Sequence, residues 1–357
     1  MKAMIAMSGG VDSSVAAYLM KEAGYDCAGV TMRLYRNEDL GRGAYSTCCS
    51  QKDIDDAADV AFRLDIDYRV VDYTADFKEA VIEKFIRTYE RGGTPNPCID
   101  CNRHLKFDKL FSFAEEEGFD VIATGHYARV VCDEASGRWL LKKALDERKD
   151  QSYVLYMLPP ERLKKIRFPL GELDKDSVRS IASEHGFVNA AKRDSQDICF
   201  VPDGDYVRFM EDYTGKTYRE GDFIDIHGNV VGRHRGAVRY TVGQRRGLGI
   251  AAARPLYVAA IDAEKNTVTV GFREALLKQT VYAEEVNLIS VDDLSEPIRV
   301  KARLRYNQKE QPAVAVMENG RLAVTFDEPQ SGVANGQSLV LYDGDIVVGG
   351  GTICASR

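Results

Sequence analysis

A glycine-rich turn near the start of the chain constrains the fold more than any other feature of the sequence. The heptapeptide SGGVDSS (residues 8–14) follows a short apolar run, residues 3–7, and opens a helical pattern that ends near Gly24. Glycine permits positive φ and close approach of the backbone to a ligand. The unpaired N–H groups and the dipole of a helix's first turn favour a phosphate. The pattern therefore predicts a phosphate site, and Asp12 implies a Mg²⁺ between its carboxylate and the phosphates.

The first 130 residues predict an α/β domain with a parallel sheet. Short apolar runs alternate with longer helical patterns, and strands separated by helices of ten or more residues are typical of βαβ units. We expect strands at 3–7, 27–34, 68–71 and 120–124, and helices at 11–23, 54–64, 76–89 and 105–117. A hairpin at 128–141 and helices at 152–158 and 175–184 follow.

After about residue 200 the pattern changes to short alternating runs between Gly and Asn turns. We expect strands at 222–226, 238–240, 256–262 and 267–270, then at 281–288, 298–304, 313–318, 321–326, 338–342 and 346–352. Six short strands in the last part predict a small barrel or sandwich. The chain thus divides into an α/β phosphate-binding domain (1–200), a small central domain (201–276) and a C-terminal β-barrel domain (277–357).

Composition adds limits to these predictions. The chain has 357 residues, a formal net charge of −7 and 45% hydrophobic residues, which is ordinary globular usage. No apolar run approaches the ~18–20 residues of a membrane span, and the start MKAMIAMSGG reads as a strand rather than a signal peptide. We therefore expect a cytoplasmic protein, in which eight cysteines are too few for a disulfide scaffold.

Two cysteine segments carry possible chemistry. TPNPCIDCN (residues 94–102) reads as a rigid loop before the helix expected from residue 105, and DSQDICF (194–200) ends the first predicted domain. Basic residues at 103, 104 and 106 are expected to lower the pKa of a nearby thiol. Taken alone, the CxxC spacing fits a zinc half-site, a pair of inert buried thiols or a catalytic thiol.

The phosphate motif resembles the PP-loop of ATP pyrophosphatases. It lacks the GK[ST] of a Walker loop and the GxGxxG of a dinucleotide fold. The resemblance implies cleavage of ATP between its α and β phosphates and adenylation of a carbonyl or amide oxygen. The residues implied in nucleotide binding are Ala6, Met7, Ser8, Gly9, Gly10, Val11, Asp12 and Ser13, with Met32 and Gly125 where an adenine could pack.

Five motifs in order extend the resemblance to nearly the whole chain. SGGVDSS, TPNPCIDCNRHLKF, ATGHYAR, KDQSYVLY and DSQDICF together resemble the tRNA-specific 2-thiouridylases (MnmA/TrmU family). The resemblance implies ATP-dependent adenylation of O2 of the wobble uridine (position 34), followed by sulfur transfer that yields 2-thiouridine, AMP and pyrophosphate. It also implies that Cys199 receives a persulfide from a sulfur-carrier protein and that Cys101 is the partner nucleophile, with a transient disulfide between them.

Cys98 departs from the simplest pattern of that family, in which many members have Asp. With Cys98, Cys101 and Cys199, three thiols could instead hold a [4Fe–4S] cluster with one iron open to sulfide. Two further functions stay open at this point. An amide-forming PP-loop ligase would need an ammonia source, and a non-catalytic RNA-binding protein would carry a vestigial phosphate loop.

A basic segment predicts contact with RNA despite the net negative charge. Residues 232–247 hold no acid and five arginines, Arg233, Arg235, Arg239, Arg245 and Arg246. Such a stripe suits a phosphate backbone, although a solvated loop is the alternative. Tyr240 among these arginines could stack on a base.

The family resemblance also implies contacts with the tRNA anticodon loop. The residues implied are Lys149, Asp150, Gln151, Arg305, Tyr306, His126 and Gln337, with Asn96, Pro97 and Cys98 around the flipped base. His126 could equally be a structural histidine. No role is assigned to Cys48 and Cys49, and we expect Cys27, Cys132 and Cys354 to be buried strand thiols.

Overall fold

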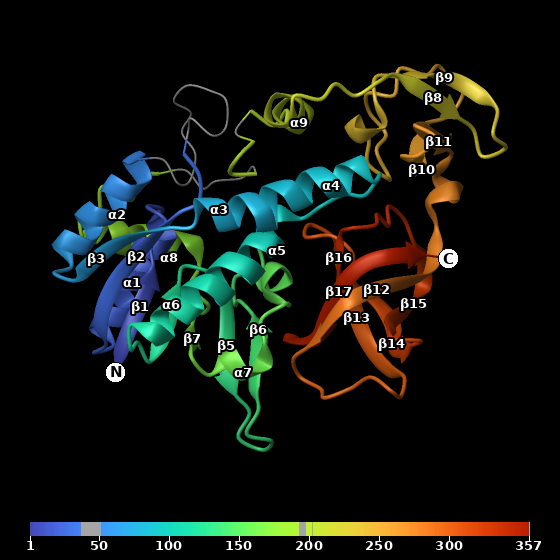
Figure 1. Cartoon of the computed structure of the whole chain (residues 1–357). Helices are drawn as coiled ribbons and strands as arrows, with labels where there is room; N and C mark the ends of the chain where they lie inside the picture. Colours follow the sequence, from blue (N-terminus) through green and yellow to red (C-terminus); the bar gives the residue numbers. More distant parts are fainter. Residues whose placement is uncertain (37–50, 193–197, 202, 357) are drawn as a thin grey trace. The chain divides into compact units, whose positions relative to one another are not determined.

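The computed structural model describes residues 1–36, 51–192, 198–201 and 203–356, which belong to two compact units (Figure 1). The first unit comprises Met1–Val81, Cys98–Asp205 and Asp345–Val347. The second comprises Ile82–Pro97, Tyr206–Gly344 and Val348–Arg357. Cys48, Cys49 and the first four residues of the DSQDICF motif lie outside the described residues.

The first unit is built on a five-stranded sheet in the order β3-β2-β1-β4-β7, in which each strand runs parallel to its neighbours. Its strands are β1 (Lys2–Ala6), β2 (Asp26–Arg33), β3 (Asp67–Asp72), β4 (Val121–Thr124) and β7 (Ile166–Arg167). A hairpin of β5 (Ala128–Cys132) and β6 (Trp139–Lys143) belongs to the same unit. The predicted parallel sheet and hairpin are therefore confirmed.

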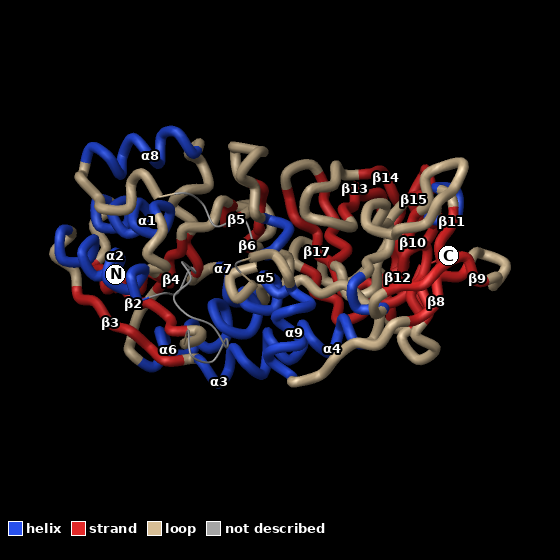
Figure 2. The backbone as a smooth tube through the Cα atoms, turned by 90° about the horizontal axis from the view of Figure 1, so that it is seen from above, coloured by secondary structure: helices blue, strands red, loops and turns tan. Residues whose placement is uncertain are grey.

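Helices cover both faces of this sheet (Figure 2). They are α1 (Val11–Glu22), α2 (Gln51–Arg63), α3 (Thr74–Phe77), α5 (Pro97–Asp100), the π-helix η3 (Cys101–Lys109), α6 (Leu110–Glu116), η4 (Ser152–Leu155), α7 (Pro160–Leu163) and α8 (Lys175–Glu184). Helices α1, α2 and α8 share one core with the sheet, formed by Ala3 and Ile5 of β1, by Met7 just after this strand and by helix residues such as Val15, Val60 and Val178. Met4 of β1 is also buried, because both faces are covered.

The second unit contains the predicted β structure. Strands β8 (Gly221–Ile224), β9 (Val230–His234), β10 (Tyr257–Asp262) and β11 (Thr267–Gly271) form a sheet in the order β10-β11-β8-β9. Strands β12 (Lys278–Leu288), β13 (Ile298–Arg303), β14 (Gln311–Glu318), β15 (Arg321–Gln330), β16 (Ser338–Asp343) and β17 (Ile346–Ser356) follow. The order β12-β15-β14-β13-β16-β17 closes through a β12–β17 pairing, so these strands form a barrel.

The remaining helical elements are short. They are η2 (Lys78–Glu83), which spans the boundary between the units, and α4 (Lys84–Glu90), α9 (Tyr206–Thr214), η5 (Ala237–Arg239) and η6 (Arg273–Leu276) of the second unit. The fold is α/β overall, as predicted, with a parallel sheet near the N-terminus and a closed β-barrel near the C-terminus. The boundaries near 200 and 277 stay predictions.

Three local predictions are wrong. The segment expected as a loop before residue 105 is helical from Pro97, because proline is favoured at the first helical position. Residues 238–240, expected as a strand, fall largely in the 3₁₀ turn η5, which follows Gly236 at φ 111°. Cys132 and Cys354, both expected to be buried, are respectively exposed at the end of β5 and half-buried in β17. Among the described helices, none has the length and hydropathy needed to cross a bilayer.

Candidate active site

The phosphate loop lies where the strand order of the sheet reverses. From β1 the chain moves through β2 to β3 on one side and later returns to β4 on the other side of β1. Because β1 and β4 are parallel neighbours, with Ala6 beside Thr124, the segments after both strands meet at one edge. Ligands of open α/β sheets bind at this switch point. The fold thus brings Met7 and Gly125 to the position where nucleotides bind in such sheets.

Two glycines permit the tight packing of this edge. Gly9 has φ 72°, a region that other residues rarely adopt, and its α-carbon lies against the backbone of Asp53. A Cβ at Gly125 would lie 2.7 Å from the backbone carbon of Asp12 and 2.7 Å from the backbone nitrogen of Ser13. The segment after β4 therefore packs directly on the first turn of α1.

The serines of the motif divide into two roles. Ser13 Oγ accepts from the Ser8 backbone nitrogen (3.1 Å) and donates to the Gly10 carbonyl (3.0 Å). Ser14 is fully buried, donates to the same carbonyl (3.2 Å) and accepts from Asn189 Nδ2 (2.9 Å). Ser14 thus holds the start of the helix, whereas Ser8 is exposed at the loop surface.

Asp12 has partners that the sequence did not reveal. Lys175, the first residue of α8, donates from Nζ to both carboxylate oxygens, at 2.7 and 2.9 Å. Tyr127 Oη donates to Oδ1 at 2.7 Å. The Lys175 side chain is only 9% exposed and that of Asp12 is 31% exposed, so the ion pair is partly buried. A Mg²⁺ on Asp12 would have to displace Lys175, and the carboxylate therefore fits a metal poorly in this conformation.

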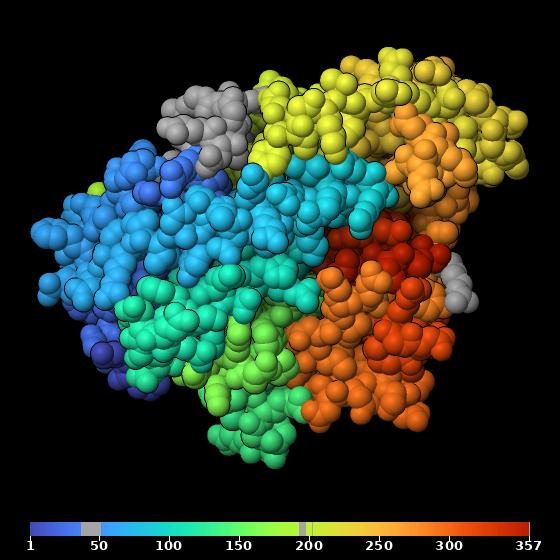
Figure 3. All heavy atoms as spheres, viewed as in Figure 1, coloured from blue at the N-terminus to red at the C-terminus, as the bar shows by residue number. Residues whose placement is uncertain are grey.

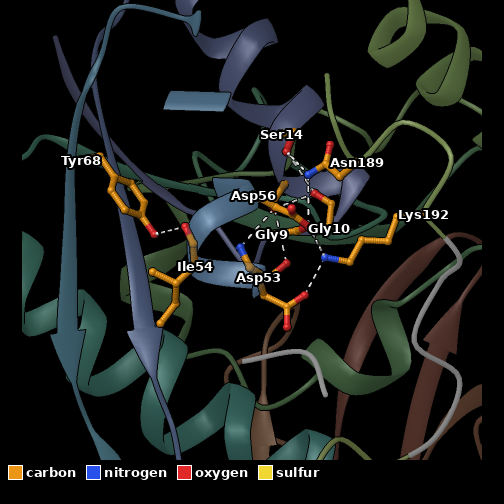
Figure 4. A network of polar contacts seen from close by, with 11 residues as sticks. Gly9, Gly10, Ser14, Asp53, Ile54, Asp56, Tyr68, Asn189 and Lys192 are labelled. Atoms are coloured by element: carbon orange, nitrogen blue, oxygen red, sulfur yellow. Dashed lines mark hydrogen bonds and ion pairs between the residues drawn. The ribbon is translucent and has the colours of Figure 1, made fainter. Parts of the chain in front are cut away.

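Behind the loop, a second group of contacts holds the Gly9 carbonyl oxygen (Figure 4). It accepts from Asn189 Nδ2 at 3.1 Å and from Lys192 Nζ at 2.9 Å. The Lys192 ammonium also pairs with Asp53 Oδ1 (2.6 Å) and Asp56 Oδ2 (2.7 Å) of α2. These contacts join the chain just before the DSQDICF motif to the phosphate loop.

The other predicted nucleotide residues lie along the same edge. Met32 is near the carboxyl end of β2 and is 9% exposed, and Ala6 ends β1. Met7 and Val11 are buried in the core under α1. Their place beside the loop agrees with a role in shaping it, while Ser8, Gly10, Asp12 and Gly125 keep some exposure.

The predicted thiols belong to the same unit as the phosphate loop. Cys98 is exposed within α5, and Cys101, half-buried, begins the π-helix η3. Cys199 is half-buried, and its carbonyl accepts from Tyr35 Oη at 3.1 Å. The next residue, Phe200, packs edge-on against Phe77 of α3 with ring centroids 5.8 Å apart.

The segments that bear Cys101 and Cys199 share α3 as a neighbour, because α3 also contacts η3. A π-helix widens the helical turn and is frequent at functional sites. Among the described residues, however, no group of three or more His, Cys, Asp or Glu side chains is arranged to hold a metal. In this conformation the described thiols are not gathered around a common point, and the [4Fe–4S] alternative stays a prediction.

His126 is buried beside the phosphate edge. Its Nδ1 lies 2.7 Å from Thr124 Oγ1, and its ring packs between Phe107 and Phe168, with centroids 5.9 Å from each. Burial, with a smaller effect from the charge of Lys106, holds the pKa of His126 well below its ordinary value. The imidazole is therefore neutral in this conformation, and its proposed contact with tRNA stays a prediction.

The segment at 149–151 is tied to the same region. Asp150 is buried, and its carboxylate accepts from the backbone nitrogens of Ala144 and Ser152, both at 3.1 Å. Gln151 Oε1 accepts from the Tyr127 nitrogen at 2.9 Å. Asp150 and Gln151 thus hold the backbone of a turn, and Lys149 is half-buried.

In the second unit, two of the residues predicted to contact RNA, Arg305 and Gln337, donate hydrogen bonds to backbone carbonyls of loops. Arg305 donates to the carbonyls of Val242 (2.8 Å) and Gly332 (2.5 Å), so it links the central segment to a barrel loop. Gln337 Nε2 donates to the carbonyls of Thr94 and Pro95, both at 3.0 Å, and so supports the loop that carries Asn96. Tyr306 is exposed, Asn96 half-buried and Pro97 buried.

The basic stripe contains paired and exposed arginines. Arg233, itself exposed, pairs with Asp222, and the half-buried Arg239 pairs with Glu211; Arg235, Arg245 and Arg246 are exposed as well. The space-filling view shows this segment, in yellow, at the molecular surface (Figure 3). Tyr240 is buried against Phe223 and His234, so the prediction that it stacks on a base is wrong.

Five residues that hold the phosphate loop were missed from the sequence: Asp53, Tyr127, Lys175, Asn189 and Lys192. Two local patterns in the sequence offer a signal for two of them. Asp53 and Asp56 are spaced three apart at the start of α2, and Lys175 follows the helix cap Asp174. Their partners lie more than 100 residues away, which no local pattern reveals.

Comparisons with known proteins agree with this architecture. Residues 1–203 match the tRNA methyl transferase HUP domain, residues 207–272 the tRNA methyl transferase PRC-barrel domain and residues 278–353 the aminomethyltransferase beta-barrel domain. A solved 4-thiouridine synthetase–RNA complex with bound ATP aligns with 60% of this chain and 50% of that chain, with 19% identity and a TM-score of 0.35. That similarity is too low to bear on function.

Full-length relatives give the family. The chain is 47% identical over 353 residues to the tRNA-specific 2-thiouridylase MnmA of Clostridioides difficile (strain 630), covering 99% of this chain and 98% of the relative. It is 48% identical over 357 residues to the enzyme of the same name from Acetivibrio thermocellus, covering 99% of each. The resemblance inferred from the motifs is thereby confirmed, and the chain belongs to the tRNA-specific 2-thiouridylase MnmA family.

Proposed function

We propose that this chain is a tRNA sulfurtransferase that uses ATP to replace O2 of the wobble uridine (position 34) with sulfur. The observation that carries the proposal is family membership along 99% of the chain, together with a phosphate loop at the switch point of the sheet. Thiolation would use the thiols of Cys101 and Cys199 in the two cysteine motifs. An amide-forming ligase would have no chemical use for these thiols.

The proposed reaction has two stages. The uridine O2 attacks the α-phosphorus of ATP, pyrophosphate leaves, and C2 becomes bonded to an adenylated oxygen. A persulfide on Cys199 then attacks C2 through its terminal sulfur. Cys101 attacks the Cys199 sulfur and breaks the S–S bond, AMP leaves with the original oxygen, and the outer sulfur stays on C2. The resulting Cys101–Cys199 disulfide is reduced by an external thiol before the next cycle.

Several chain residues have proposed roles in this scheme. The loop from Ser8 to Ser13 binds the phosphates of ATP, and the edge at Met32 and Gly125 receives the adenine. No step depends on a metal bound to Asp12, because Lys175 covers that carboxylate; Mg²⁺ would arrive with the phosphates of ATP. A persulfide-carrying protein is the proposed sulfur source.

The anticodon loop is the proposed RNA partner. Asn96, Pro97 and Cys98 would surround the extruded base, which costs little to flip from a loop that is already largely unpaired. Lys149, Tyr306 and the exposed arginines of the stripe would contact the backbone. Asp150, Gln151, Arg305, Gln337 and His126 would act through the segments that they hold.

The decisive experiment supplies ATP, an unmodified tRNA transcript and a persulfide donor to purified protein. Wild type should form 2-thiouridine with one AMP and one pyrophosphate per thiolated base. Cys199→Ala should lose thiolation but keep tRNA-dependent pyrophosphate release, because adenylation needs no thiol. Cys132→Ala, which removes an exposed thiol on β5, is the matched control and should behave as wild type.

Two results would refute parts of the proposal. Thiolation by Cys199→Ala would remove the persulfide role of this residue. Absence of ATP cleavage by wild type with any tRNA transcript would remove the adenylation step itself.

A further inference from the structure

The carbonyl of Gly9 is held from behind by two side chains of a distant segment. Asn189 Nδ2 and Lys192 Nζ donate to this oxygen at 3.1 and 2.9 Å. Asn189 also donates to Ser14 Oγ, so it bridges the loop and the first turns of α1 (Figure 4). Both donors come from residues just after α8, more than 170 residues further along the chain.

The ammonium of Lys192 faces carboxylates of α2. Asp53 and Asp56 accept from it at 2.6 and 2.7 Å, and their side chains are 8% and 16% exposed. Burial lowers the pKa of Lys192, but hydrogen bonds to and attraction by these two carboxylates outweigh that effect and raise the pKa above its ordinary value. The charge of Lys192 is thus more than compensated by the two carboxylates, which suits a structural donor better than a phosphate ligand.

The start of α2, which carries these two carboxylates, is itself hydrogen-bonded to the parallel sheet. Tyr68 of β3 donates from Oη to the Ile54 carbonyl at 3.2 Å and to Thr31 Oγ1 at 2.7 Å. Thr31 in turn donates to the Met7 carbonyl at 2.7 Å. The start of α2 and the end of β1 therefore have a common support.

Peptide geometry connects this anchor to the ligand side of the loop. The described chain contains no cis peptide bond, and in a trans peptide the C=O and the following N–H point in opposite directions. When Asn189 and Lys192 hold the Gly9 oxygen on one side, the Gly10 N–H must point to the other. Gly9 itself has a positive φ and no side chain to fix its peptide, so outside contacts are needed to select this orientation.

We infer that Asn189 and Lys192 are positioning residues of the phosphate loop, which orient the Gly9–Gly10 peptide so that its N–H faces the phosphates of ATP. The inference rests on the proposed function, because it assumes that ATP binds at this loop. It assigns no contact with substrate to either side chain. Their effect on the reaction passes through the Gly9 carbonyl and, for Asn189, also through Ser14 in the first turn of α1.

The test compares ATP binding in two independent variants of the full chain. Asn189→Ala removes one donor without changing charge. Lys192→Met combined with Asp56→Asn removes the second donor and one of its carboxylate partners, so that the net charge is unchanged. Loss of the neutral hydrogen bond in Asn189→Ala should weaken ATP binding about fivefold, and loss of the charge-assisted bond in the Lys192 variant should weaken it about tenfold, while the Kd for tRNA stays as in wild type. Lys192→Arg, which keeps the positive charge and the N–H donors, should retain most of the ATP affinity of wild type.

The control is Lys165→Met, which removes a lysine paired with Glu115 on the same unit and should leave ATP binding unchanged. Unaltered ATP affinity in folded Asn189→Ala protein would overturn the inference, even if the Lys192 variant fails to fold. Equal losses of ATP and tRNA affinity would also overturn it, because they would indicate general structural damage. Failure of wild type to bind ATP would instead refute the proposed function, and the inference with it.

Discussion

Single residues around the phosphate loop have functions set by partners distant in the sequence. Asp12, at the start of α1, implied a metal when it was considered alone, yet the structure gives it Lys175 and Tyr127. The Asp12 side chain is 31% exposed, whereas Lys175 is nearly buried, so the carboxylate compensates an ammonium that would otherwise be costly to bury. His126 solves the same problem by staying neutral, with its ring between two phenylalanines.

The neutral state of His126 predicts a pH-dependent stability. Its pKa in the folded protein is well below the value of 6.5 expected when unfolded, so below pH 6.5 the unfolded chain takes up a proton that the folded chain does not. Stability should fall as pH drops, by up to about 1.4 kcal/mol per pH unit from this group. His126→Gln lacks this effect, so the difference in Tm between wild type and variant should narrow from pH 7.5 to pH 5.5.

The exposed His227 provides the control, and His227→Gln should show no such convergence. A gap between wild type and His126→Gln that stays constant over this pH range would contradict a buried neutral imidazole.

At the scale of elements, periodicity predicted most of the first unit. Apolar runs and helical spacing placed β1, α1 and α8 within a residue or two, because each buries a regular face. The helical elements that were missed do not depend on a regular apolar face. Pro97 starts a helix eight residues early, and this helix continues as a π-helix with no sequence signature.

The same limit applied to the candidate site. The glycine motif located the phosphate loop, because a position that needs a positive φ, such as that of Gly9, favours glycine and is therefore recognisable in the sequence. The residues behind it, such as Asn189, become recognisable only when the fold brings them to the Gly9 carbonyl.

The contact between the β4 end and α1 gives an element-scale prediction. A Cβ at Gly125 would press within 2.7 Å of the α1 backbone, which cannot rotate away. Gly125→Ala should therefore separate the two segments, lower stability by roughly 1–3 kcal/mol and weaken ATP binding on the order of tenfold or more. Equilibrium binding of ATP to the folded variant measures the second effect.

Gly118→Ala is the control for Gly125→Ala, because it adds a methyl group without steric crowding. Gly118 has φ 76°, and no atom lies within 4 Å of the position that a Cβ would take there, so alanine should cost only backbone strain and leave ATP affinity unchanged. If both variants bind ATP equally well, the close packing at Gly125 has no bearing on the nucleotide site.

Over the whole chain, charge is distributed unevenly. The net charge of −7 would disfavour RNA if it were uniform. The second unit nevertheless carries four exposed arginines within the stripe at 232–247, of which Arg233 pairs with Asp222; the half-buried Arg239 pairs with Glu211. Exposed guanidinium groups can release counterions from a phosphate backbone, and paired ones contribute less.

This difference predicts which arginines govern affinity for tRNA. Arg245→Gln combined with Arg246→Gln should weaken tRNA binding roughly tenfold at moderate salt and reduce the slope of log Kd against log salt by about 2, one per lost phosphate contact. Arg254→Gln, at an exposed arginine of the same unit that is paired with Glu274, should leave the slope unchanged. Filter binding at four salt concentrations measures both quantities. An unchanged slope in the double variant would show that the stripe is a solvated loop, and the RNA surface would then have to lie elsewhere on the chain.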